Sequence, residues 1–259
     1  MRRRHHFVGV PIIVALLLLI ALLSACGHKQ PHVDVPPPPV PTSTEAPART
    51  EPNTASKPTQ GTDAADLAEP TIPPDATPIA SQTGLASWYG PPYHNRRGSN
   101  GEVYNMHAMT AAHREFPLGS IVRVTNVKTG HAALVRITDR GPFIRGRILD
   151  LSLAAARKLD VQQSGVAEVK VELMQSGAPA GTPGKWAVQI GGFPDENEAT
   201  KLADHLTRRY HTAKVLRFAS PAGDWWIRVR VLDDDHARAQ QLAAETETPE
   251  GAVFLVRLD

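Results

Sequence analysis

Two acidic residues, Asp139 and Glu102, stand beside predicted turns, where a carboxyl group is available for acid–base chemistry. Asp139 ends a strand-like run and precedes Arg140-Gly141-Pro142, a rigid turn that can hold its carboxyl group at a groove. From spacing alone, an ion pair with a nearby arginine or a turn-capping role explains Asp139 better. Glu102 follows an evident turn and also fits a solvated loop residue.

Histidines offer a second kind of chemistry. His113 follows two alanines and is as consistent with a buried structural residue as with a site residue. His94, His107 and His131 lack a metal-binding spacing such as HxxxH backed by a carboxylate. The sequence therefore predicts no metal site, and nothing in it calls for a cofactor.

Aromatic residues near these groups have two readings. Trp88, Tyr89 and Tyr104 offer faces on which a sugar can stack, and a place in the core fits them equally well. Asp150, in the run RILDLS, is expected to cap the following helix or bind backbone amides rather than take part in catalysis.

Short strand-like runs must position these residues. From Gly84 on, β-type runs separated by glycine-containing turns predict a small β-barrel or sandwich over residues 84–175. These runs cover residues 85–90, 120–127, 131–139 and 166–174. A helical patch at 152–160 has Ser152 as its expected N-cap, and residues 176–184 form a short linker.

The remaining residues, 185–259, form a second predicted domain. Their pattern is strand, helix, strand, strand, helix, strand, which is a βαβ unit written twice. Such a repeat predicts a ferredoxin-like βαββαβ fold, an antiparallel four-stranded sheet with two helices on one face. The fold class is therefore multidomain, mainly β followed by α+β.

The start of the chain is typical of a targeting segment. Residues 2–6 are RRRHH, and an uncharged apolar run follows from Phe7 to Ala25. Such a run is also long enough to span a bilayer. Its end, LSACG, resembles the lipobox of bacterial lipoproteins, which implies that residues 1–25 are removed and that Cys26 carries the lipid. The absence of Asp at position 27 follows the pattern of outer-membrane sorting.

Composition separates a tether from the folded regions. Residues 26–83 contain no aromatic residue, and 13 of the chain's 23 prolines lie in 27–83, which predicts a disordered tether. The net charge of +2 includes three arginines of the signal, and residues 84–175 hold 12 basic against 7 acidic residues. The basic residues are scattered, so nucleic-acid binding is not expected.

Six motifs in the first domain resemble, in order, those of the rare lipoprotein A family. They are GLASWYG, NGEVY, MTAAH, VRVTN, TDRGPF and RILDLSLAAA. That family pairs a double-psi β-barrel with a C-terminal SPOR domain behind a lipoprotein signal. The chain departs from it at residues 93–102, where YHNRRGSNGE replaces a stretch more usually like FHGxxTANGE.

The resemblance implies an endolytic lytic transglycosylase. Such an enzyme cleaves MurNAc–GlcNAc bonds of denuded, peptide-free peptidoglycan strands, leaves 1,6-anhydromuramyl ends, and serves septal wall processing and daughter cell separation. It implies Asp139 and Glu102 as the catalytic carboxylates and His113 as a third site residue. Arg140 would orient Asp139 or bind substrate, together with Trp88 and Tyr104.

The second domain resembles SPOR domains, beginning with KWAVQIGGF. The resemblance implies that the exposed face of its sheet binds denuded glycan through Gln189, Arg228 and either Trp225 or Trp226. Side chains alternate along a strand, so only one of the two tryptophans can face that ligand.

The sequence is therefore consistent with two functions. The first is the outer-membrane transglycosylase, which faces the periplasm at the division septum. The second is a non-catalytic peptidoglycan-binding lipoprotein with an expansin-like or structural role. Both have glycan as partner and a membrane anchor at Cys26, and both leave protein partners in the division machinery open.

Overall fold

The computed structural model describes residues 67–211, 214–219, 223–248 and 251–259. The predicted signal (residues 1–25), Cys26 and most of the predicted tether lie outside these residues. Within them, no helix has both the length and the apolar character needed to cross a bilayer.

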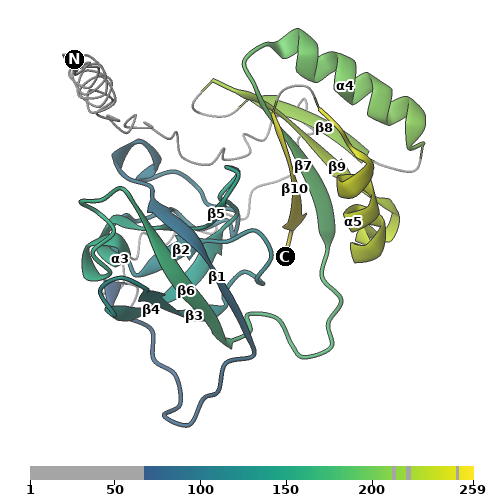
Figure 1. Cartoon of the computed structure of the whole chain (residues 1–259). Helices are drawn as coiled ribbons and strands as arrows, with labels where there is room; N and C mark the ends of the chain where they lie inside the picture. The colour runs from purple at the N-terminus through teal and green to yellow at the C-terminus, as the bar shows by residue number, and fades with distance from the viewer. Residues whose placement is uncertain (1–66, 212–213, 220–222, 249–250) are drawn as a thin grey trace, which may run out of the picture. The chain divides into compact units, whose positions relative to one another are not determined.

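The first folded region is a closed six-stranded barrel (Figure 1). Its strands follow the order β1-β5-β2-β4-β3-β6 around the barrel, which confirms the predicted barrel. The strands are β1 (Ala80–Trp88), β2 (Thr110–Ala112), β3 (Ile121–Asn126), β4 (Ala132–Asp139), β5 (Arg147–Leu151) and β6 (Val166–Gln175). A 3-10 turn, η1 (Pro91–Tyr93), and helix α3 (Leu153–Lys158) complete it.

Alternation along the strands fills the barrel. In β4, Ala133, Val135 and Ile137 are buried, and the residues between them are more exposed. Because residues two apart share one face of a strand, Asp139 continues this inward-facing series at the end of β4. Asp139 is therefore buried by its place in the strand.

Two sequence-based boundaries can be compared directly. Helix α3 has Ser152 as its N-cap, and the Ser152 hydroxyl accepts a hydrogen bond from the Ala155 amide, which confirms that prediction. Strand β1 begins at Ala80, inside the segment assigned to the tether, and Thr83 pairs with Lys170 of β6. Cross-strand pairing orders these residues although their composition resembles that of the tether.

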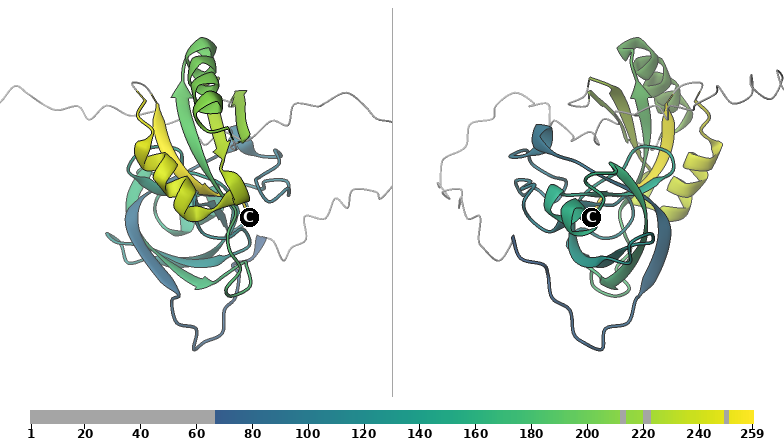
Figure 2. Two further views of the ribbon diagram at one scale, coloured as in Figure 1. Left: turned by 90° about the vertical axis from the view of Figure 1, so that its right-hand side faces the viewer. Right: turned by 60° about the vertical axis from the view of Figure 1, so that its left-hand side comes forward.

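The second folded region is a four-stranded antiparallel sheet of order β10-β7-β9-β8, as predicted (Figure 1). Its elements are β7 (Trp186–Phe193), α4 (Glu196–Arg209), β8 (Lys214–Ala219), β9 (Trp225–Arg230), η2 (Leu232–Asp234), α5 (His236–Glu245) and β10 (Ala252–Arg257). Both helices cover one face of the sheet (Figure 2), where Leu206 and Leu242 pack with Ile190 and Ile227. No helix of the described residues packs on the other face.

Candidate functional site

The Asp139 carboxylate lies at the C-terminal end of β4, beside Ala112 of β2. Its Oδ1 atom accepts three hydrogen bonds, from the Ser99 amide (2.9 Å), the Ser99 hydroxyl (2.5 Å) and the Arg140 amide (2.7 Å). Burial raises the pKa of Asp139, and these hydrogen bonds oppose the increase. A carboxyl group with a raised pKa can carry a proton closer to neutral pH.

Arg140 stabilises the turn behind this carboxylate. Its guanidinium donates from Nη1 to the carbonyl oxygens of His113 (3.0 Å) and Phe116 (2.9 Å). Burial lowers the pKa of Arg140 to about 10, and Asp139 acts in the opposite direction. Arg140 thus orients Asp139 through its backbone amide and ties β4 to the segment that follows β2.

Glu102 stands on a turn that packs against the end of β4. The Gly98 amide donates to the Glu102 carbonyl (2.8 Å), and the Asn100 amide donates to the Thr138 carbonyl (3.3 Å). The Glu102 side chain is exposed, and its Oε2 accepts a hydrogen bond from Asn100 Nδ2 (2.6 Å). The structure thus places an exposed carboxylate on the same turn that contacts the buried one.

His113 is a buried, neutral residue. Its Nδ1 accepts hydrogen bonds from the amides of Glu115 (3.1 Å) and Phe116 (2.9 Å), so the proton resides on Nε2, which lies 3.3 Å from Gln82 Oε1. Burial, with Arg114 and Arg140, lowers its pKa to about 3. The imidazole therefore organises the turn whose carbonyl groups hold Arg140.

Tyr104 and Trp88 pack in or against the core, which is one of the two roles predicted for them. Tyr104 is buried, stacks on Tyr89 with ring centroids 4.3 Å apart, and donates its hydroxyl to the Tyr89 carbonyl (2.8 Å). Trp88 is half-buried and packs against the barrel core. These contacts favour a supporting role for both side chains.

Contrary to the sequence-based expectation, Asp150 neither caps the helix, which Ser152 does, nor accepts a hydrogen bond from a backbone amide of the described residues. It accepts hydrogen bonds from the Ser87 hydroxyl (2.7 Å) and from Arg147 Nη2 (3.2 Å) and is almost completely buried. Burial raises its pKa, and Arg147 and Ser87 counter this effect. Arg147, one of the arginines near Asp139 in the sequence, therefore pairs with Asp150 instead, and no local pattern indicated the roles of Ser99 and Ser87.

The helix-free face of the second sheet gathers the other predicted ligand-binding residues. Gln189 and Arg228 are register partners, and Arg228 donates from Nε (3.2 Å) and Nη2 (2.8 Å) to Gln189 Oε1. Trp226 shares their side of the sheet by alternation. Trp225 instead packs on the helix-covered face with the core of this region. Of the two tryptophans, Trp226 shares this face with Gln189 and Arg228, and the structure buries both Trp226 (4% exposed) and Gln189 (0% exposed) instead of presenting them on an exposed face.

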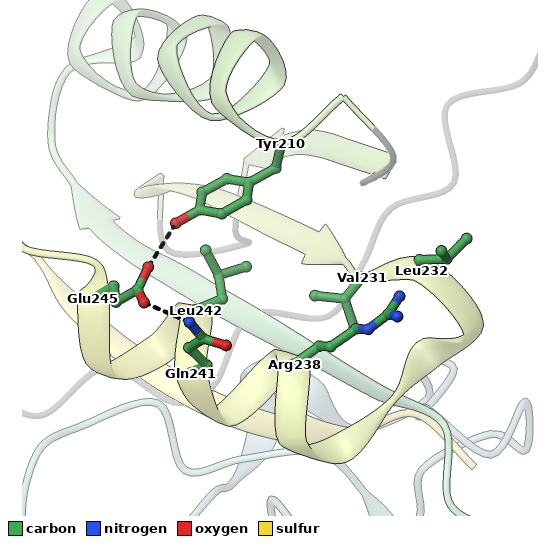
Figure 3. Close-up of a pocket in the computed structure, with 7 residues that line it drawn as sticks. All are labelled: Tyr210, Val231, Leu232, Arg238, Gln241, Leu242 and Glu245. Carbon is green, nitrogen blue, oxygen red and sulfur yellow. Dashed lines mark hydrogen bonds between the residues drawn. The ribbon is translucent and has the colours of Figure 1, made fainter.

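A cavity of about 270 Å³ lies elsewhere, beside α5 (Figure 3). Its polar rim is internally bonded, since Glu245 accepts hydrogen bonds from Gln241 (2.7 Å) and Tyr210 (3.4 Å). None of the predicted site residues lines it. Across the described ranges, no group of three or more His, Cys, Asp or Glu residues is placed to hold a metal ion.

Comparison with known families agrees with this two-part layout. A family model described as lytic transglycolase matches residues 81–171, and the SPOR domain model matches residues 182–250. Two solved structures were matched, each with a TM-score of 0.31. They are a Streptomyces papain inhibitor (20% identity, covering 39% of this chain and 100% of that one) and a Clavibacter michiganensis expansin (16% identity, covering 60% and 81%). That TM-score is too low to support a structural argument.

Curated relatives carry the name endolytic peptidoglycan transglycosylase RlpA. The one from Neisseria meningitidis serogroup B is 47% identical over 132 residues, covering 50% of this chain and 55% of the relative. The one from Helicobacter pylori J99 is 38% identical over 151 residues, covering 48% of each. The chain therefore spans about half the length of these relatives. The order of the two matched models and these identities show that the chain is similar to proteins of the rare lipoprotein A family.

Proposed function

We propose that the chain is an endolytic lytic transglycosylase that cleaves MurNAc–GlcNAc bonds in denuded peptidoglycan strands. The observation that carries this proposal is the buried carboxyl group of Asp139, whose partners are all neutral hydrogen-bond donors. Such a group can hold a proton until substrate binds. The names of the relatives, which describe peptidoglycan transglycosylases, agree with this function.

In the proposed reaction, Asp139 donates its proton to the glycosidic oxygen as the bond from that oxygen to the muramyl C1 breaks. The leaving sugar departs with a 4-hydroxyl group. The muramyl 6-hydroxyl then attacks C1, and its proton returns to Asp139, so the carboxyl group ends as it began. No water is consumed, and a 1,6-anhydromuramyl end forms. Glu102, exposed on the neighbouring turn, stabilises positive charge at C1 or positions the sugar.

The proposal extends to location. The lipobox-like sequence supports a lipid on Cys26 and an outer-membrane anchor facing the periplasm, and the SPOR match supports enrichment on denuded septal glycan. A Cys26→Ala variant should lose lipid labelling and membrane attachment. If this variant stays in the outer-membrane fraction, the anchor proposal is wrong.

The decisive experiment incubates the purified full chain with denuded glycan and detects products by mass spectrometry. We expect 1,6-anhydromuramyl ends with the natural sequence and a loss of about 100-fold or more in Asp139→Asn, since general acid–base groups contribute on that scale. Glycan binding without anhydro ends would instead establish the non-catalytic, expansin-like function.

A further inference from the structure

The two oxygens of the Asp139 carboxylate have different surroundings. All three hydrogen bonds to this side chain end on Oδ1, and two of them come from Ser99. Oδ2 receives no hydrogen bond from any residue that the structure describes. Asp139 keeps 8% of its surface exposed, so a route from Oδ2 to an incoming ligand remains. The carboxylate is thus held on one side only.

The residue before Ser99 is a glycine that packs closely against the end of β4. A Cβ atom at Gly98 would lie 3.3 Å from the Thr138 carbonyl oxygen and 3.7 Å from the Asp139 carboxyl carbon. The first distance is tighter than most Cβ contacts, so a larger residue would require the turn or Thr138 to shift by a few tenths of an ångström. Gly98 therefore allows this close packing, and both donors of Ser99 reach the Asp139 carboxylate.

We propose that Ser99 is a positioning residue for Asp139. The amide and hydroxyl of Ser99 fix Oδ1 of Asp139 as the acceptor and leave Oδ2 as the oxygen that delivers the proton. This inference rests on the proposed function, in which Asp139 is the acid. The hydroxyl also stabilises the charged carboxylate, which opposes the rise in the Asp139 pKa caused by burial. Ser99 thereby affects the pH range in which the acid is protonated.

The test is Ser99→Ala in the full chain, with kcat/KM measured on denuded glycan from pH 4 to 9. Loss of the hydroxyl should raise the pKa of Asp139, so the alkaline limb of the profile should move up by about 1 pH unit. Ser99→Thr restores a hydroxyl and should return the limb toward its original place. Ser164→Ala, which removes a hydroxyl bonded to Val161 in a distant turn, is the matched control.

A second readout separates this inference from the proposed function. The Asp139 carboxyl is titrated by ¹³C NMR in the full chain, with Asp139→Asn assigning its signal. If Ser99→Ala leaves the titration midpoint unchanged, the positioning role is wrong whatever the activity does. If the midpoint rises while the activity profile stays in place, Ser99 holds the carboxylate but Asp139 is not the acid. If Ser99→Ala disturbs the turn, Ser99→Gly provides a second variant that lacks the hydroxyl.

Discussion

Asp139 and Asp150 pair with the same residue, Ala112, from opposite edges of β2. The two carboxylates are both buried, yet their partners differ in kind. Asp150 has the guanidinium of Arg147, whereas hydroxyl and amide groups alone bond to Asp139. One end of the barrel thus holds an ion-paired carboxylate on β5 and, across β2, a carboxyl group on β4 that is suited to exchange a proton.

The Asp150–Arg147 pair should matter for stability far more than a surface pair. Asp150→Ala leaves the Arg147 guanidinium buried without its counter-charge, and we expect a loss of about 3–5 kcal/mol in the free energy of unfolding. Urea titration measures this value. Glu196→Ala, which removes an exposed partner of Arg217, should cost at most about 1 kcal/mol. Similar losses in both variants would contradict the prediction.

Alternation and capping made most of the fold predictable. The long strands of the barrel, helix α3 with its Ser152 cap, and all six elements of the second domain follow from local patterns. Strands β2 and β5 were not predicted, because three or five residues carry too little periodicity. They exist through parallel pairing with β4 and β1, which no local pattern contains.

The site was predictable in part. Asp139, Glu102 and His113 were identified through family motifs, because spacing alone favoured structural roles for them. Ser99 was missed because its partner lies 40 residues away in the sequence. The buried, neutral state of His113 was also not predictable, since it depends on two amide donors supplied by the folded turn.

His113 should make the protein sensitive to acid. Its pKa of about 3 lies below the usual value near 6.5, so between these values the unfolded state binds a proton that the folded state does not. Its contribution is therefore fully present above pH 6.5 and is lost as pH falls toward 3, at about 1.4 kcal/mol per pH unit.

Urea unfolding at several pH values tests this effect against His113→Asn. The asparagine side-chain oxygen can accept the Glu115 and Phe116 amide hydrogen bonds but does not titrate. The free energy of unfolding of the His113→Asn variant should therefore depend less on pH. Parallel stability curves for the two proteins between pH 4 and 6.5 would show that His113 does not carry the acid sensitivity.

Glu102→Gln should reduce activity without affecting the fold. The side chain is exposed and bonded only to Asn100 among the described residues, so the midpoint of urea unfolding should stay the same. Removing its charge beside the developing positive sugar should lower kcat/KM about 10- to 100-fold. Glu168→Gln, an exposed carboxylate on β6, is the matched control and should retain full activity. Equal activity in both variants would remove Glu102 from the mechanism.

Substitutions of the two adjacent tryptophans of β9 should have different effects, one on glycan binding and the other on stability. Trp226 lies on the helix-free face with Arg228 and Gln189, so Trp226→Ala should weaken co-sedimentation with amidase-treated sacculi by about 30-fold. Trp225 packs with the core on the opposite face, so Trp225→Ala should cost roughly 2–4 kcal/mol in stability. Below its unfolding temperature that variant should bind glycan normally. If Trp225→Ala weakens binding while Trp226→Ala binds fully, the glycan lies on the other face of the sheet.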